Sequence, residues 1–123
     1  MATWTLTKTA RFEASHVLPH HDGKCARLHG HSWTVAIEVR AESLQGGGPQ
    51  VGMVLDYAAI SRPLRRLVER SLDHYHLNDS TGLENPTSEA LAVWIFGQLY
   101  LDVPLLRAVT IEETCTSRCR YEP

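Results

Sequence analysis

The seven residues Cys25–His31 place one thiol and two imidazoles within a short stretch of chain. After His31 the even-numbered side chains are mainly polar, whereas the odd-numbered ones are apolar, namely Trp33, Val35, Ile37 and Val39. This period of two is typical of a β-strand, in which alternate side chains project from one face. We therefore expect a strand over residues 29–42, with His29 and His31 on its buried side.

A third histidine, His16, follows a first strand that we expect over residues 4–15. It shares the parity of the apolar residues of that strand, which are Trp4, Leu6, Ala10, Phe12 and Ala14. Three histidines therefore converge on one buried face. Three imidazoles without a fourth protein ligand leave one coordination position open, which favours a catalytic Zn²⁺ over a structural one. Ordinary packing as satisfied core histidines is the alternative for any one of them.

Motifs along nearly the whole chain carry a family resemblance. They are Phe12-Glu-Ala-Ser-His16, Cys25-x-x-x-His29-Gly-His31, Leu72-Asp73-His74 followed by Leu77-Asn78, Asn85-Pro-Thr-Ser-Glu89 and Glu113-Thr-Cys-Thr116. In this order they resemble the 6-pyruvoyl-tetrahydropterin synthase family. Within it they are most similar to the branch that forms 6-carboxy-tetrahydropterin for queuosine biosynthesis.

The resemblance implies a lyase that uses Zn²⁺ and no external redox cofactor. Its expected substrate is the small molecule 7,8-dihydroneopterin triphosphate, and its products are 6-carboxy-5,6,7,8-tetrahydropterin, acetaldehyde and triphosphate. A pyruvoyl-forming synthase with the same zinc ligands is the alternative within the family. An alternative of another class is a non-catalytic module that binds a metal or a pterin.

Such a reaction needs a base for a carbon-bound proton, and Cys25 is the best candidate. A thiolate works as a base only when its pKa is lowered, and Lys24, Arg27 and a nearby zinc ion are positive neighbours of the kind that lower it. The alternative for Cys25 is a small buried thiol that only fills space, which is the commoner role of a cysteine. The resemblance implies that the cysteine works with the aspartate and histidine of the Leu-Asp-His motif, here Asp73 and His74. A helix cap and a dipole partner are the alternative roles for these two.

Glu113 continues the apolar parity of Val109 and Ile111, so its carboxylate is expected to face an interior. A ligand that offers two donors would satisfy this carboxylate. The resemblance implies that Glu113 holds the donor edge of the pterin. Lys24 and Arg27 are expected to hold phosphate groups of the substrate.

Length and composition limit the other possibilities. The 123 residues suit one domain over residues 1–123. The net charge of -2 provides no basic field for nucleic acid, and no apolar run reaches the length of a transmembrane helix. The N-terminus lacks the charged segment followed by an apolar one that is typical of a signal peptide. Three cysteines, an odd number in a chain without a secretory signal, favour reduced thiols over a framework of disulfides. These features predict a cytoplasmic protein that binds neither nucleic acid nor membrane.

Two helices and two further strands are expected after residue 55. Asp56 is expected to cap the first helix, with Pro63 either kinking it or delaying its start to Ser61. Asn85 is expected to cap the second helix, with Pro86 at its first position. The segment 108–114 and the short strand 119–121 complete the order ββααββ. This order predicts an α+β fold, in which a four-stranded antiparallel sheet carries both helices on one face.

The edges of such a sheet must be paired or covered. The resemblance implies the tunnelling fold, in which the sheets of several subunits join into a barrel with the helices outside. We therefore expect a homo-oligomer, a hexamer built from two trimers, whose active sites lie between subunits.

Overall fold

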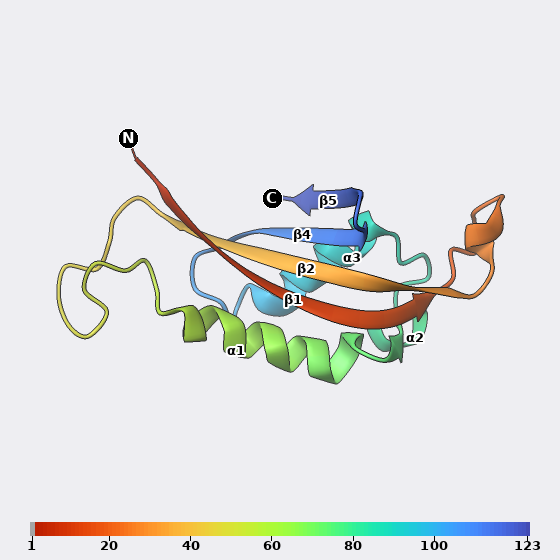
Figure 1. Ribbon diagram of the computed structural model, residues 1–123, viewed down its shortest axis with the longest axis horizontal. Helices are drawn as coiled ribbons and strands as arrows, with labels where there is room; N and C mark the ends of the chain where they lie inside the picture. Colours follow the sequence, from red (N-terminus) through yellow and green to blue (C-terminus); the bar gives the residue numbers. More distant parts are fainter. Residues whose placement is uncertain (1) are drawn as a thin grey trace.

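The computed structural model describes residues 2–123 and shows a twisted sheet with helices packed on one face (Figure 1). Two long strands, β1 (Trp4–His16) and β2 (His29–Ala41), form an antiparallel pair at its centre. The other strands are β3 (Tyr75–His76), β4 (Leu106–Thr114) and β5 (Ser117–Tyr121), and the strand order is β3-β1-β2-β4-β5. The helices are α1 (Tyr57–Leu67), α2 (Leu77–Thr81) and α3 (Ser88–Leu99). A π-helical turn over Val68–Leu72 extends α1, and a 3₁₀ turn over Lys24–Ala26 lies between β1 and β2.

The α+β class is confirmed, but the four-stranded antiparallel sheet with two helices is wrong. Within residues 2–123 the sheet has five strands, and its fifth strand, β3, pairs in parallel with β1. The additional helix is α2, which follows β3 directly. Residues 75–81 contain no alternation long enough to reveal a two-residue strand or a five-residue helix. Contacts with the end of β1, rather than local pattern, specify these two elements.

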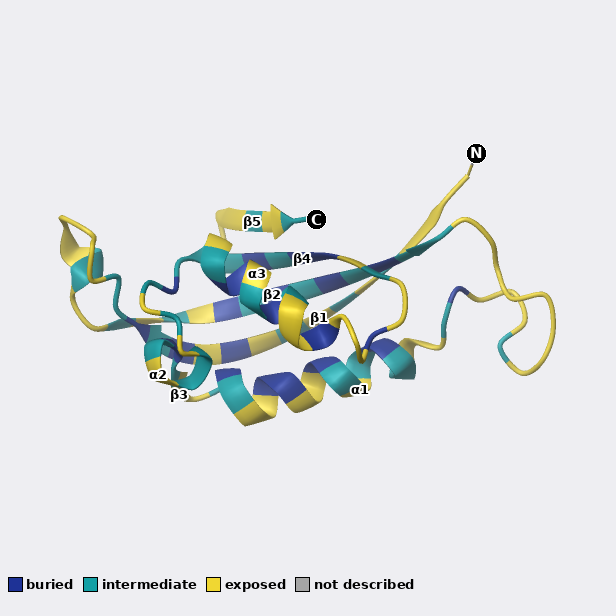
Figure 2. Cartoon of the chain, turned by 180° about the vertical axis from the view of Figure 1, so that it is seen from behind, coloured by how far each residue is buried: buried dark blue, intermediate teal, exposed yellow. Residues whose placement is uncertain are grey.

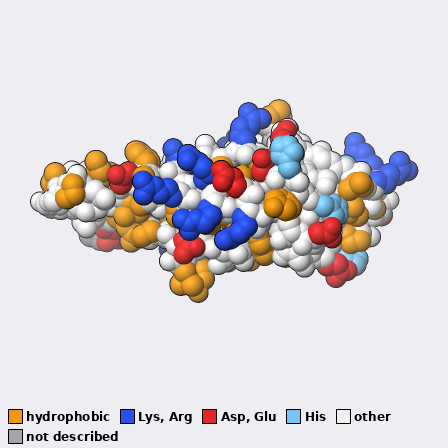
Figure 3. Space-filling view, turned by 90° about the horizontal axis from the view of Figure 1, so that it is seen from below, with side chains coloured by type: hydrophobic (Ala, Val, Ile, Leu, Met, Phe, Trp, Pro, Cys, Tyr) orange, Lys and Arg blue, Asp and Glu red, His pale blue; other side chains and the backbone are white. Residues whose placement is uncertain are grey.

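The core lies between the sheet and helices α1 and α3 (Figure 2). The odd-numbered side chains of β2 from Trp33 to Val39 are fully buried, as their alternation predicts. The helices cover them with a buried stripe on each helix, made of Ile60, Leu64 and Leu67 on α1 and of Leu91, Ile95 and Leu99 on α3. The opposite side of α1 is basic, and Figure 3 shows Lys and Arg side chains gathered on this underside of the molecule. No helix of the described chain has the length and apolar character needed to cross a bilayer.

The two helix starts differ in how well the sequence predicts them. Asp56 caps α1 as expected, because its side chain accepts a hydrogen bond from the Ala58 backbone N–H. The alternative start near Ser61 is wrong, since α1 begins at Tyr57 and contains Pro63. The predicted cap of the later helix is also wrong, because Thr87, not Asn85, caps α3 by accepting from the Ala90 N–H at 3.1 Å. Pro86 therefore precedes the helix.

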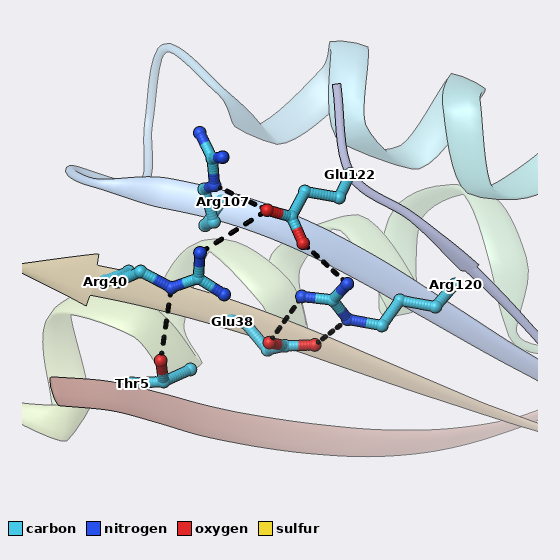
Figure 4. Close-up of polar contacts among 6 residues, drawn as sticks. All are labelled: Thr5, Glu38, Arg40, Arg107, Arg120 and Glu122. Atoms are coloured by element: carbon cyan, nitrogen blue, oxygen red, sulfur yellow. Dashed lines mark hydrogen bonds and ion pairs between the residues drawn. The ribbon is translucent and has the colours of Figure 1, made fainter. Parts of the chain in front are cut away.

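On the face of the sheet opposite the helices, a polar network joins the strands (Figure 4). Arg120 on β5 contacts both carboxylate oxygens of Glu38 on β2, at 2.8 and 3.0 Å, and Glu122 at 2.6 Å. Glu122 also pairs with Arg107 on β4 at 2.9 Å and with Arg40 on β2 at 3.4 Å. The network therefore ties the short edge strand β5 to β2 and β4.

Replacing Arg120 by methionine is expected to lower the free energy of unfolding by roughly 0.5–1 kcal/mol, because the partly exposed pair with Glu38 is screened by solvent. The Arg120 hydrogen bonds hold the pKa of Glu38 below its ordinary value of 4.5. A carboxyl group with a lowered pKa stabilises the fold above its ordinary value and loses this contribution as pH falls. The deficit of the variant should therefore be full at pH 7 and shrink below about pH 4.5. Urea titrations at pH 7 and below about pH 4.5 measure this deficit in the free energy of unfolding, with Arg66→Met on α1 as the control. A deficit that is the same at both pH values would contradict a stabilising pair between Arg120 and the Glu38 carboxylate.

Candidate metal centre

Three histidines meet where β1 ends and β2 begins, at the right-hand end of the sheet in Figure 1. The register of the two strands pairs His16 with His29 and Ala14 with His31. The ring centroid of His16 lies 4.5 Å from that of His29 and 5.2 Å from that of His31. The ring centroids of His29 and His31 are 4.9 Å apart. One ligand atom from each ring lies within 4.8 Å of the other two. The three residues predicted as metal ligands are thus brought together.

Backbone carbonyls fix the orientation of two of these rings. His16 Nδ1 donates to the Pro86 carbonyl oxygen at 2.9 Å, and His29 Nδ1 donates to the Arg27 carbonyl oxygen at 2.7 Å. A carbonyl oxygen only accepts, so Nδ1 carries a proton in both rings, and Nε2 is the nitrogen left for another partner. Hydrogen bonds of this kind are typical of imidazoles that bind a metal through their other nitrogen.

The three Nε2 atoms are buried and have no hydrogen-bond partner within the described residues. Buried polar atoms are normally paired, so three unpaired atoms in one group need a reason. Burial is also the main cause that lowers the pKa of His16 and of His31 below the ordinary value of 6.5. A lowered pKa keeps an imidazole neutral, which is the form that binds a metal. The group therefore fits a divalent metal such as zinc, which three imidazoles suit.

A carboxylate borders the histidine group. Glu113 Oε1, on β4, lies 3.5 Å from His16 Nε2 and 3.6 Å from His31 Nε2. The Glu113 side chain is 30% exposed and also lines a pocket of about 440 Å³ together with Glu89, Ser88, Ser117, Arg118 and Cys119. Glu113 thus faces the histidines and an open pocket, in keeping with the interior position that its strand parity predicts.

Asp73 and His74 form a contact of their own at the β3 edge of the sheet. His74 Nδ1 lies 3.0 Å from Asp73 Oδ2, and Asp73 Oδ1 accepts a hydrogen bond from the Glu13 N–H at 2.9 Å. That backbone hydrogen bond is the main cause of the lowered pKa of the Asp73 carboxyl group. The His74 ring is 79% exposed, yet it lines the same cavity of about 570 Å³ as His31. His74 and His31 therefore line one open cavity, whereas Asp73 and the other two histidines are not part of its lining.

His74 has a backbone φ of 63°, in the left-handed region that disfavours residues with a Cβ. Its N–H donates to the Glu13 carbonyl oxygen, which fixes this conformation. We expect His74→Gly to leave the free energy of unfolding unchanged or to raise it by about 1 kcal/mol, because glycine removes the steric cost. Thermal and urea unfolding measure this, with Tyr75→Gly, in the adjacent strand, as the control that should destabilise. A large loss of stability in His74→Gly would show that the ring itself holds the fold.

The structure leaves Cys25 outside the histidine group. Cys25 is half-buried in the 3₁₀ turn of loop 17–28, and its neighbours Lys24 and Arg27 are exposed. The loop is held by a hydrogen bond from the Leu18 N–H to the Cys25 carbonyl oxygen and by contact of His20 with Glu84 at 2.9 Å. The single chain therefore assembles the histidines and Glu113, whereas Cys25 and the Asp73–His74 pair remain on separate segments.

Sequence reasoning missed several polar partners around this end of the sheet. The carbonyl groups of Pro86 and Arg27 carry no signal in the side-chain pattern, so only the structure reveals that they orient His16 and His29. His76 Nδ1 lies 3.0 Å from Ser15 Oγ, in the cavity that His31 and His74 line. The pairing of β1 with β3 places these two side chains together, 61 residues apart in the sequence.

Known proteins are similar to this chain in sequence and in fold. The family model described as 6-pyruvoyl tetrahydropterin synthase matches residues 5–123. A protein of Synechocystis sp. named 6-carboxy-5,6,7,8-tetrahydropterin synthase is 51% identical over 119 residues, which cover 96% of this chain and 92% of that protein. A Bacillus subtilis protein of the same name is 33% identical over 134 residues, covering 98% and 86%. The solved structure of Caenorhabditis elegans 6-pyruvoyl tetrahydropterin synthase superposes with a TM-score of 0.84 at 27% identity, covering 100% of this chain and 97% of that one.

Proposed function

Because this chain belongs to the 6-pyruvoyl tetrahydropterin synthase family, we propose that it converts 7,8-dihydroneopterin triphosphate to 6-carboxy-5,6,7,8-tetrahydropterin in queuosine biosynthesis. Acetaldehyde and triphosphate are the other products. The relatives named 6-carboxy-5,6,7,8-tetrahydropterin synthase support the carboxy-forming reaction over nearly the full length of the chain. The observation that carries the proposal is the group of three Nε2 atoms, unpaired within the described residues, in a chain with these relatives. One of the three histidines, His31, lines an open cavity.

Zn²⁺ is the metal that we propose for the histidine group, with His16, His29 and His31 as its ligands. When bound, Zn²⁺ would supply a Lewis acid that acidifies the side-chain hydroxyl groups of the substrate. The chain's own contribution is the burial that lowers the pKa of His16 and His31, the carbonyl groups that orient His16 and His29, and the open cavity that His31 lines.

The pocket beside Glu113 is the proposed site of the pterin ring. The pyrimidine edge of a pterin presents adjacent N–H donors, and a carboxylate accepts two such donors in parallel. Glu113 would accept these hydrogen bonds, and the second pocket carboxylate, Glu89, borders the same space. The same carboxylate lies 3.5 Å from His16 Nε2 and 3.6 Å from His31 Nε2, so the proposed pterin pocket borders the histidine group.

Proton transfer is assigned to Cys25 and His74. Cys25 would remove the carbon-bound proton as a thiolate, His74 would carry a proton to or from the substrate, and Asp73 would orient the His74 ring through Nδ1. The exposed Lys24 and Arg27 flank Cys25 and would hold the triphosphate.

Self-association would bring these segments together. Cys25 lies outside the histidine group, and β3 and β5 form the two edges of the sheet. Edges of this kind are commonly paired with another chain. We therefore propose a homo-oligomer, a hexamer, in which residues of neighbouring copies complete each active site. Sedimentation of the purified protein tests its size.

The deciding experiment is incubation of zinc-loaded protein with 7,8-dihydroneopterin triphosphate, with assay of acetaldehyde and of the pterin product. We expect acetaldehyde and 6-carboxy-5,6,7,8-tetrahydropterin in equal amounts. Triphosphate release with a pyruvoyl pterin and no acetaldehyde would instead assign the second candidate, which the similarity to the Caenorhabditis elegans structure favours. Absence of any turnover would contradict both enzymes and support the non-catalytic binding module.

A further inference from the structure

We infer that a pocket between strand β1 and helix α1 binds a small anion that carries a phosphate group. This β1–α1 pocket has a volume of about 320 Å³, and three cationic side chains line it, namely Lys8, Arg11 and Arg65. Its volume is at the lower end of the range of about 300–1,000 Å³ that is typical of small-molecule sites. None of the three histidines of the metal centre lines the pocket, so the inference is independent of the proposed function.

Lys8 is a cation in a row of β1 that is otherwise apolar. Its side chain has the same parity as Leu6, Ala10 and Phe12, and it is half-buried. A charged group that leaves water loses hydration, and a partner of opposite charge normally compensates for this loss. Across residues 2–123, Lys8 forms no ion pair with any carboxylate. The described chain therefore supplies no counterion for this half-buried charge.

Arg11 and Arg65 bring two further positive charges to the same pocket, one from each element. Neither guanidinium group forms an ion pair within the described residues. By contrast, every arginine of strands β2, β4 and β5 pairs with a glutamate, namely Arg40, Arg107, Arg118 and Arg120. Like charges repel one another, so a bound anion would stabilise three cations that share one pocket.

Two carboxylates also line the β1–α1 pocket, but they do not neutralise its cations. Asp73 Oδ1 accepts a hydrogen bond from the Glu13 N–H, and its Oδ2 contacts His74. Glu69 follows Arg65 by four residues, yet it forms no ion pair in the part of the chain that the structure describes. Three cations against two carboxylates leave the lining positive, which favours an anionic ligand.

The donors of this pocket suit phosphate oxygens. A guanidinium group presents paired N–H donors that match a phosphate group, and an ammonium group adds a compact positive charge. The hydroxyl groups of Thr9 and Ser61 also line the pocket and can donate hydrogen bonds to the same ligand. Inorganic phosphate and the phosphate end of a nucleotide share this chemistry.

Thermal unfolding of the zinc-loaded protein in inorganic phosphate tests the site, with chloride added to keep the ionic strength constant. A ligand that binds only the native state raises the unfolding midpoint, and its concentration dependence gives the affinity. We expect Lys8→Met and Arg65→Met to bind phosphate about tenfold more weakly than the parent protein, because each loses a charge-assisted hydrogen bond. Lys8→Arg should retain most of the affinity. The matched control is Arg66→Met, which removes a cation of α1 that does not line the pocket.

Three results would overturn the site. Equal phosphate affinity in Lys8→Met and the parent protein would show that the Lys8 stem only packs on Leu64 and Val68 while its ammonium group reaches water. Equal weakening in Lys8→Met and Arg66→Met would show a general effect of positive charge. Weakening in Lys24→Met but not in Lys8→Met would place the phosphate at the proposed substrate site instead.

Adenosine monophosphate, titrated in the same way, distinguishes the two sources of the phosphate group. Tighter binding than inorganic phosphate, lost in Lys8→Met, would identify a nucleotide site. Equal or weaker binding, also lost in Lys8→Met, would identify a site for the free anion. None of these measurements uses turnover, so the pocket can fail to bind phosphate while the proposed function stands, and the reverse.

Discussion

Replacement of His31 by alanine is expected to release the metal and to abolish turnover, while the fold survives. His31 supplies one of the three Nε2 atoms of the group, and its side chain is 21% exposed, so its removal leaves little buried cavity. His16 is less suitable for this test because it is fully buried and holds the Pro86 carbonyl group. Loss of a hydrogen-bond partner to a metal ligand already lowers affinity by roughly 10- to 100-fold, and loss of the ligand itself should cost more.

The measurements for His31→Ala are metal content after dialysis, turnover of the pterin triphosphate and the far-UV spectrum of the fold. His20→Ala is the matched control, because His20 is an exposed histidine of the neighbouring loop that pairs with Glu84. The control should keep its metal and its activity. Retention of stoichiometric zinc by His31→Ala would show that the metal lies elsewhere.

The histidine group shows how far alternation in the sequence predicts a site. The apolar parity of β2 predicts the buried face that the structure shows, and the strand ends at Ala41, one residue from the expected end. Parity also places His16 and Glu113 on the side of their strands that faces the group. A strand has only two faces, so a period of two determines the direction of each side chain once the strand is known.

Other features depend on contacts that no local pattern encodes. The two-residue β3 exists because Tyr75 and His76 pair with Ala14 and Ser15, some 60 residues earlier. The cap of α3 is Thr87 because its hydroxyl group reaches the Ala90 N–H, and this leaves the Pro86 carbonyl group to His16. Backbone carbonyls are identical at every residue, so a sequence gives no indication of which ones orient the ligands.

Replacement of Cys25 by alanine is expected to lower turnover by about 10²- to 10⁴-fold, the range typical of a lost general base. Zinc content should not change, because Cys25 lies outside the histidine group of the described chain. The contrast with His31→Ala is the informative part of the test. One variant should lose chemistry and metal together, whereas the other should lose chemistry alone.

The control for Cys25→Ala is Cys115→Ala, which removes an exposed thiol in the turn between β4 and β5. Its turnover and zinc content should match those of the parent protein. Loss of zinc from Cys25→Ala would mean that the thiol helps to hold the metal in solution, although it lies outside the histidine group of the described chain. Near-normal turnover would exclude Cys25 as the base, and His74, which lines the same cavity as His31, would be the next candidate for this role.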